Sequence, residues 1–146
     1  MPLIRSCPSC GTRNRIPAAH VSDTGRCGKC RSSLPAVNEP IEVDGALFDD
    51  IVQNARVPVL ADFWAAWCGP CRMAAPEVAR VASEMAGKAV VLKVDTERHP
   101  QLAERFKIRG IPYFAVFYQG RPVMQQAGVV DHQQMESWLT TAAQAA

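Results

Sequence analysis

Trp67-Cys68-Gly69-Pro70-Cys71 is the stretch from which the fold of this chain can be worked out. Two thiols three residues apart, with the second inside a helix, can open and close a disulfide. Proline lacks a backbone N–H and is favoured in a first helical turn, so Pro70 predicts that a helix begins at this motif. Cys68 would then lie at the helix N-terminus, where unpaired N–H groups and the helix dipole favour a thiolate.

Apolar residues after the motif recur at the spacing of one helix face. Met73, Val78, Val81 and Met85 share that face, and the helix is expected to run to about Gly87.

Four apolar runs predict the strands of a sheet. Residues 57–64 and 89–95 are apolar on both alternating faces, which is typical of strands buried in the middle of a sheet. Residues 113–118 and 123–127 flank Gln119-Gly120-Arg121-Pro122, which predicts an antiparallel hairpin. A short edge strand is expected at residues 41–43.

Capping residues predict the remaining helices. Asp44 and Asp131 are each suited to cap a helix N-terminus, and residues 100–106 are expected to form a short helix. The residues predicted to face inward from the first and last helices are Leu47, Phe48, Ile51, Val52, Met135, Trp138 and Leu139. The fold class is therefore α/β, with a mixed central sheet and helices on both faces.

The dithiol predicts thiol–disulfide exchange. The Cys68 thiolate would attack a substrate disulfide, and Cys71 would then displace the reduced substrate. Cys68 is expected at the helix tip, within reach of solvent, and Cys71 one turn inside. A structural disulfide and half of a metal site are the alternatives.

Asp62 is a single carboxyl in an apolar strand, six residues before Cys68. Burial would raise its pKa and suit it to take the proton from Cys71. A solvated aspartate at the strand end is the alternative.

Two further Cys-x-x-Cys pairs near the N-terminus predict a zinc ribbon. They bracket sixteen residues, a separation typical of four-cysteine zinc sites, and their members are Cys7, Cys10, Cys27 and Cys30. Only Ile16 and Val21 are large apolar residues between the pairs, so metal binding is expected to supply most of the folding free energy. Two additional redox dithiols are the alternative.

Composition predicts two units. Residues 1–38 carry six basic residues against Asp23 alone, a formal charge of +5, whereas the whole chain of 146 residues has +2. The proline-bearing stretch 32–40 reads as a linker, which gives a zinc-ribbon unit at 1–38 and a second domain at 39–146. No apolar run suggests a signal peptide or a membrane span, so a soluble cytoplasmic protein is expected, where thiols stay reduced.

The segment Asp62-Phe63-Trp64-Ala65-Ala66-Trp67-Cys68-Gly69-Pro70-Cys71 resembles the active-site segment of thioredoxin. Ile111-Pro112 resembles the cis-proline loop of that family, and Gly128 the glycine that closes its substrate groove. The N-terminal cysteine pairs resemble the zinc-binding extension of the thioredoxin 2 subtype, so the resemblance covers the whole chain.

This resemblance implies a protein-disulfide reductase with a redox-active disulfide, one zinc ion on four cysteines and no organic cofactor. It implies disulfide-containing protein substrates, an NADPH-dependent thioredoxin reductase as electron donor, and a cytoplasmic monomer. The zinc unit would be structural or redox-sensing, with a part in the oxidative stress response. The implied catalytic residues are Cys68, Cys71 and Asp62, and the implied substrate contacts are Trp67, Gly69, Pro70, Ile111, Pro112 and Gly128.

A rival interpretation is a zinc-ribbon module that binds nucleic acid or protein and carries a thioredoxin-like domain. The basic residues of 1–38 support it. No aromatic residue that could stack on a base occurs there, however, and the dithiol would be unexplained, so nucleic acid is not an expected partner.

Overall fold

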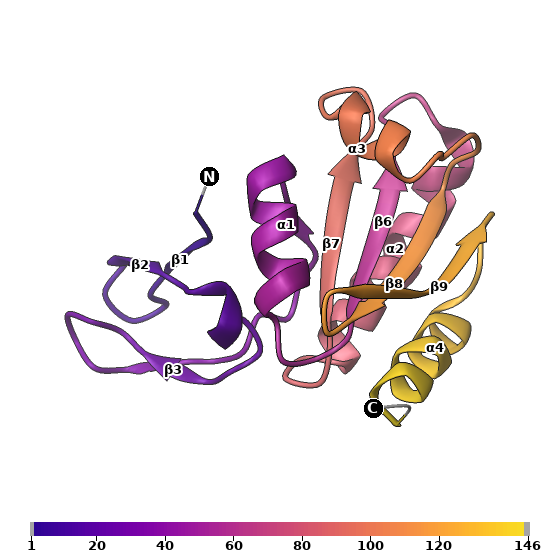
Figure 1. Ribbon diagram of the computed structural model, residues 1–146. Coiled ribbons are helices and arrows are strands. Elements are labelled where there is room, and N and C mark those ends of the chain that lie inside the picture. The colour runs from indigo at the N-terminus through magenta and orange to yellow at the C-terminus, as the bar shows by residue number, and fades with distance from the viewer. Residues whose placement is uncertain (1, 145–146) are drawn as a thin grey trace.

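The computed structural model describes residues 2–144, so that Met1, Ala145 and Ala146, at the outer ends of the two expected units, lie outside it. The larger part is built on a five-stranded sheet with the strand order β5-β7-β6-β8-β9 (Figure 1). β5 and β6 both pair in parallel with β7, whereas β8 is antiparallel to β6 and β9. The strands are β5 (Ile41–Glu42), β6 (Val59–Trp64), β7 (Val90–Asp95), β8 (Tyr113–Tyr118) and β9 (Arg121–Ala127).

Helices cover both faces of this sheet, as predicted. One face packs against α1 and α3, and the other against α2 and α4. Asp44 and Asp131 cap α1 and α4 through side-chain bonds of 2.8 Å to the backbone N–H groups of Leu47 and Gln134. The helices are α1 (Gly45–Asn54), α2 (Gly69–Glu84), α3 (Pro100–Arg105) and α4 (His132–Gln144). No helix within residues 2–144 is both long and apolar enough to cross a membrane.

β6 is buried on both faces because its side chains alternate between two hydrophobic clusters. Ala61 and Phe63 lie in the cluster under α1, and Leu60 lies in the cluster under α2 and α4. The carboxyl end of this central strand leads directly into the Trp67–Cys71 motif.

The N-terminal part consists of two short hairpins and a 3-10 turn. β1 (Ile4–Ser6) pairs with β2 (Arg13–Arg15), and β3 (Gly25–Arg26) pairs with β4 (Ser33–Leu34). The expectation that residues 32–40 form a linker is therefore wrong at its start. Ser33 and Leu34 form β4, and the Leu34 side chain is buried against Cys7 and Cys27.

The 3-10 turn η1 (Ala18–His20) packs the N-terminal part against the larger part. Ala18 and Val21 are buried in the same cluster as Phe48 and Ile51 of α1. Figure 1 shows the hairpins beside α1, on the side of that helix away from the sheet. Metal binding is therefore not the only source of folding energy for this segment, because Val21 contributes to the core of its neighbour.

Two other local expectations are corrected. Met73 is 70% exposed rather than on the inward face of α2, and α2 ends at Glu84, with Gly87 in the following turn. The β8–β9 hairpin turns on Gln119 and Gly120 alone, whose φ angles of 53° and 81° suit a two-residue turn. β9 therefore begins two residues before the predicted position 123.

Candidate active site and metal centre

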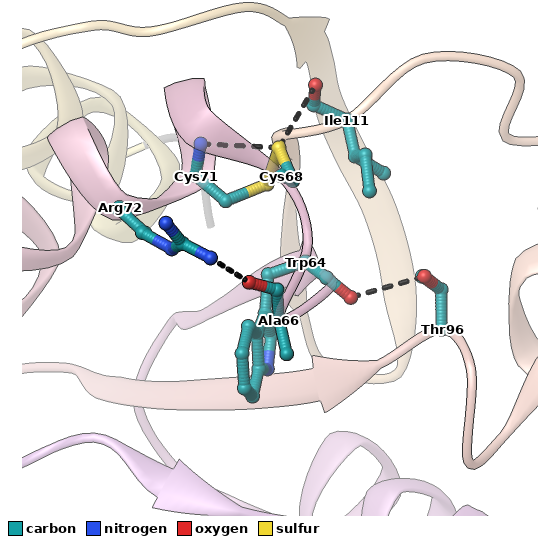
Figure 2. Close-up of a disulfide and its surroundings, with 7 residues drawn as sticks. All are labelled: Trp64, Ala66, Cys68, Cys71, Arg72, Thr96 and Ile111. Atoms are coloured by element: carbon teal, nitrogen blue, oxygen red, sulfur yellow. Dashed lines mark hydrogen bonds between the residues drawn. A yellow bond between two sulfur atoms is a disulfide. The ribbon is translucent and has the colours of Figure 1, made fainter.

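The Trp67–Cys71 motif forms a disulfide at the N-terminus of α2. Cys68 is the N-cap residue, and its Sγ accepts a hydrogen bond of 3.1 Å from the backbone N–H of Cys71 (Figure 2). A disulfide joins Cys68 to Cys71, with their Cα atoms 5.2 Å apart. Gly69 and Pro70 form the first turn of the helix, so the predicted helix start is confirmed.

Exposure does not separate the two cysteines in this oxidised form. Cys68 is 3% exposed and Cys71 is 5% exposed, so the expectation of a solvent-accessible Cys68 is wrong here. Both pack with Ala65 under the side chains of Trp64 and Ile111. What separates them is the hydrogen bonding, because within residues 2–144 only the Cys68 sulfur accepts a bond from the helix N-terminus.

The loop before β8 reaches the disulfide from the other side. The Ile111–Pro112 peptide bond is cis, and the Ile111 carbonyl oxygen lies 3.7 Å from the Cys68 sulfur. The Pro112 carbonyl accepts a hydrogen bond of 2.9 Å from Gly128, which has a φ of +98° that favours glycine. Trp67 is 66% exposed on the same loop as Cys68. The predicted substrate contacts Trp67, Ile111, Pro112 and Gly128 thus lie on segments that meet beside Cys68.

Asp62 is the buried carboxyl of this region. It is 1% exposed, and its Oδ1 has no hydrogen-bond partner within residues 2–144. Burial raises its pKa to about 7 because the charged form is desolvated, and the opposing pull of Lys93 on the neighbouring strand is smaller. The alternative of a solvated aspartate is therefore excluded. Lys93 itself lies with its Nζ 4.5 Å from the ring centroid of Trp64.

Two residues that support the motif were not predicted. Arg72 donates from Nη2 to the Ala66 carbonyl at 2.7 Å, and Thr96 donates from its N–H and Oγ1 to the Trp64 carbonyl at 2.9 and 3.0 Å (Figure 2). These three bonds hold the end of β6 and the loop between β6 and α2. Arg72 could have been found, because it lies one helical turn after Cys68. Thr96 is distant in sequence and gave no signal.

The four N-terminal cysteines converge as the ribbon spacing predicts. The sulfurs of Cys7 and Cys30 lie 3.6 Å apart, and those of Cys10 and Cys27 lie 3.7 Å apart. Four sulfurs placed tetrahedrally about 2.3 Å from a zinc ion would be separated by roughly 3.8 Å. The arrangement fits a single zinc ion.

Backbone groups favour the thiolate form that a metal needs. The N–H groups of Ser9 and Lys29 each lie 3.4 Å from the sulfur two residues before them. The pKa of Cys27 is lowered to about 6, first by the N–H of Cys30 and then by that of Lys29. The pKa of Cys7 is raised instead, because the N–H groups of Cys10 and Ser9, which lower it, are outweighed by desolvation and the neighbouring sulfurs. Since zinc binds thiolates, the surroundings of Cys27 are the ones that favour the metal.

Comparison with known proteins gives matches to both parts of the chain. The family model "Thioredoxin" matches residues 39–141, and the model "Thioredoxin 2, N-terminal" matches residues 6–32. Thioredoxin C-3 of Corynebacterium nephridii is 36% identical over 137 residues, which cover 94% of this chain and 93% of that protein. A bifunctional thioredoxin reductase/thioredoxin of Mycobacterium leprae is 42% identical over 88 residues, covering 60% of this chain and 19% of that protein.

A solved thioredoxin structure also matches the larger part of the chain. A thioredoxin mutant from Halobacterium salinarum NRC-1 superposes with a TM-score of 0.68 at 32% identity, covering 73% of this chain and 93% of that one.

Proposed function

The chain belongs to the thioredoxin family of thiol–disulfide oxidoreductases, and from that premise we propose that it reduces disulfides in other proteins through Cys68 and Cys71. The observation that carries the proposal is the Cys68–Cys71 disulfide at the N-terminus of α2, beside the Ile111 carbonyl. Helix N-terminal N–H groups favour the Cys68 thiolate once the disulfide is reduced.

The exchange proceeds in two steps. The Cys68 thiolate attacks one sulfur of the substrate disulfide, which forms a mixed disulfide and releases the other substrate sulfur as a thiolate. Cys71 then loses its proton and attacks the Cys68 sulfur, which releases the second substrate thiolate and restores the Cys68–Cys71 disulfide. Two electrons pass from the dithiol to the substrate.

Asp62 serves as the proton acceptor for Cys71 in this scheme. A carboxyl with a pKa of about 7 changes protonation state near neutral pH, which is the property that a general base requires. It lies on β6, the strand that leads directly into the motif.

The exposed Trp67 and the cis Ile111–Pro112 loop form the substrate surface. An extended substrate chain would pair with the backbone of Ile111 and place its disulfide against Cys68. Gly128 extends this surface, since its N–H holds the Pro112 carbonyl, and Gly69 and Pro70 present the first turn of α2.

The N-terminal cysteines hold one zinc ion with a structural role. Its binding would tie together the two hairpins and so keep η1 in place against α1. On this proposal the units are 1–38 and 39–146, although they share a buried cluster.

A flavin-dependent, NADPH-dependent thioredoxin reductase is the proposed electron donor, acting on a cytoplasmic monomer. The Mycobacterium leprae relative, which combines thioredoxin reductase and thioredoxin in its name, supports this pairing.

A coupled assay tests the function. NADPH oxidation is followed with a thioredoxin reductase, the zinc-loaded chain and a disulfide-bonded protein substrate. The parent is expected to sustain turnover and the Cys68→Ala variant to stop it. Turnover by Cys68→Ala at the parental rate would refute the assignment.

A further inference from the structure

A cleft in the N-terminal part lies outside the disulfide site and has no role in the exchange. Its volume is about 390 Å³, within the range of small-ligand sites. The apolar side chains of Ile16, Leu34 and Val37 line it, together with Pro17 and Val21 of the segment that packs on α1. No residue of the Trp67–Cys71 motif or of the Ile111–Pro112 loop belongs to the lining.

Three arginines from three different strands also line this cleft. Arg5, Arg15 and Arg26 come from β1, β2 and β3, and none forms an ion pair within residues 2–144. Arg5 and Arg26 each donate to one backbone carbonyl, which leaves most of the five guanidinium N–H donors of each available. The carboxyl of the lining is Asp23, whose Oδ2 already lies 2.7 Å from Nδ1 of His20.

Offsetting the charge of a zinc-tetrathiolate centre would be the simplest role for these arginines. The contacts argue against it, because the described partners of the sulfurs are one another, backbone N–H groups, the hydroxyls of Thr12 and Ser32, and the Asn14 amide. The guanidinium bonds described go to carbonyl oxygens instead. The three guanidinium groups therefore have no anionic partner among residues 2–144.

We propose that this cleft binds a small organic anion, whose apolar body packs against Ile16, Leu34 and Val37 and whose carboxylate, sulfonate or phosphate group lies on the arginines. Charge complementarity selects the anionic group, and the apolar walls select a body larger than an inorganic ion. No Phe, Tyr or Trp side chain lines the cleft for base stacking, which favours a small anion over a nucleic acid strand. Binding stabilises the zinc unit, because the site combines residues of both hairpins.

The test uses the zinc-loaded full chain and 8-anilinonaphthalene-1-sulfonate as the probe, titrated by fluorescence and calorimetry. One site is expected, with affinity at least tenfold weaker in the Arg15→Gln/Arg26→Gln double variant. Arg13→Gln is the matched control, because Arg13 shares β2 with Arg15 but does not line the cleft, and its affinity should stay within twofold of the parent. Zinc content and circular dichroism establish that each variant is folded.

Two further probes test the apolar body and the anionic group of the ligand separately. Uncharged N-phenyl-1-naphthylamine and inorganic sulfate should each bind at least tenfold more weakly than the sulfonate probe. Equal affinity of the double variant and the parent, or equal binding of either partial probe, would overturn the proposal. So would amide chemical-shift changes on probe binding that spare Gly25 and Val37, which line the cleft.

Discussion

Replacing Asp62 with asparagine removes a buried carboxyl while keeping the shape of the side chain. The carboxyl has a pKa of about 7 in the folded chain against 3.8 as its ordinary value. Because the folded state holds the proton more tightly, the parent loses stability as the pH rises from about 4 to about 7. Each pH unit in that window costs about 1.4 kcal/mol, so ionised Asp62 costs about 4 kcal/mol above pH 7.

Asp62→Asn should therefore be more stable than the parent, and its advantage should grow with pH. Between pH 5 and pH 8 the difference in the free energy of unfolding is expected to rise by about 2.5 kcal/mol. Urea unfolding of both oxidised, zinc-loaded proteins across that range measures it. The same variant should slow resolution of the mixed disulfide near neutral pH, as followed by stopped flow, because the proton acceptor is lost.

The matched control is Asp50→Asn, which makes the same chemical change at an exposed position of α1. Its effect on the unfolding free energy should stay nearly constant between pH 5 and pH 8. A parent-to-variant difference for Asp62→Asn that is equally flat would refute the reasoning, since it would mean that Asp62 ionises in the folded chain as it does in the unfolded one.

Three other outcomes are expected. Cys68→Ser should form no mixed disulfides, whereas Cys71→Ser should accumulate them on non-reducing gels, and equal trapping would reverse the assigned roles. Val21→Ala should lower the free energy of unfolding by about 2 kcal/mol through two lost methyl groups and the cavity left behind, while Val123→Ala at an exposed site should cost under about 0.5 kcal/mol. Cys27→Ser should lose the zinc found by metal analysis and still reduce disulfides; retained zinc would exclude a four-cysteine site.

The sequence was most informative where local rules act alone. The caps of α1 and α4 and the start of α2 at the motif follow from the chemistry of Asp44, Asp131 and Pro70, which needs no distant partner. The burial of β6 on both faces also follows from its pattern, although its first two predicted residues lie outside the strand.

Tertiary packing explains what the sequence could not supply. Met73 shows an error of helical phase instead, because it lies five residues before Val78, about 140° away around the helix, and is 70% exposed. The buried face of α2 carries Cys71, Ala74, Val78, Val81 and Ala82. Cys68 is at a helix tip but is covered by Ile111, forty-three residues away. The cover that Ile111 gives to Cys68 cannot be deduced from spacing along one segment.

Val21 raises the question of whether the zinc unit can influence the dithiol. Ile111 packs against both the cluster that contains Val21 and the one that contains Cys68, so a continuous packed path joins them. A packed path is not by itself energetic coupling, because coupling requires an element whose position both sites alter. α1 is the element in question, since Val21 packs against it. Val21→Ala loosens that contact without removing a zinc ligand, so it separates an effect transmitted by packing from an effect of the metal itself.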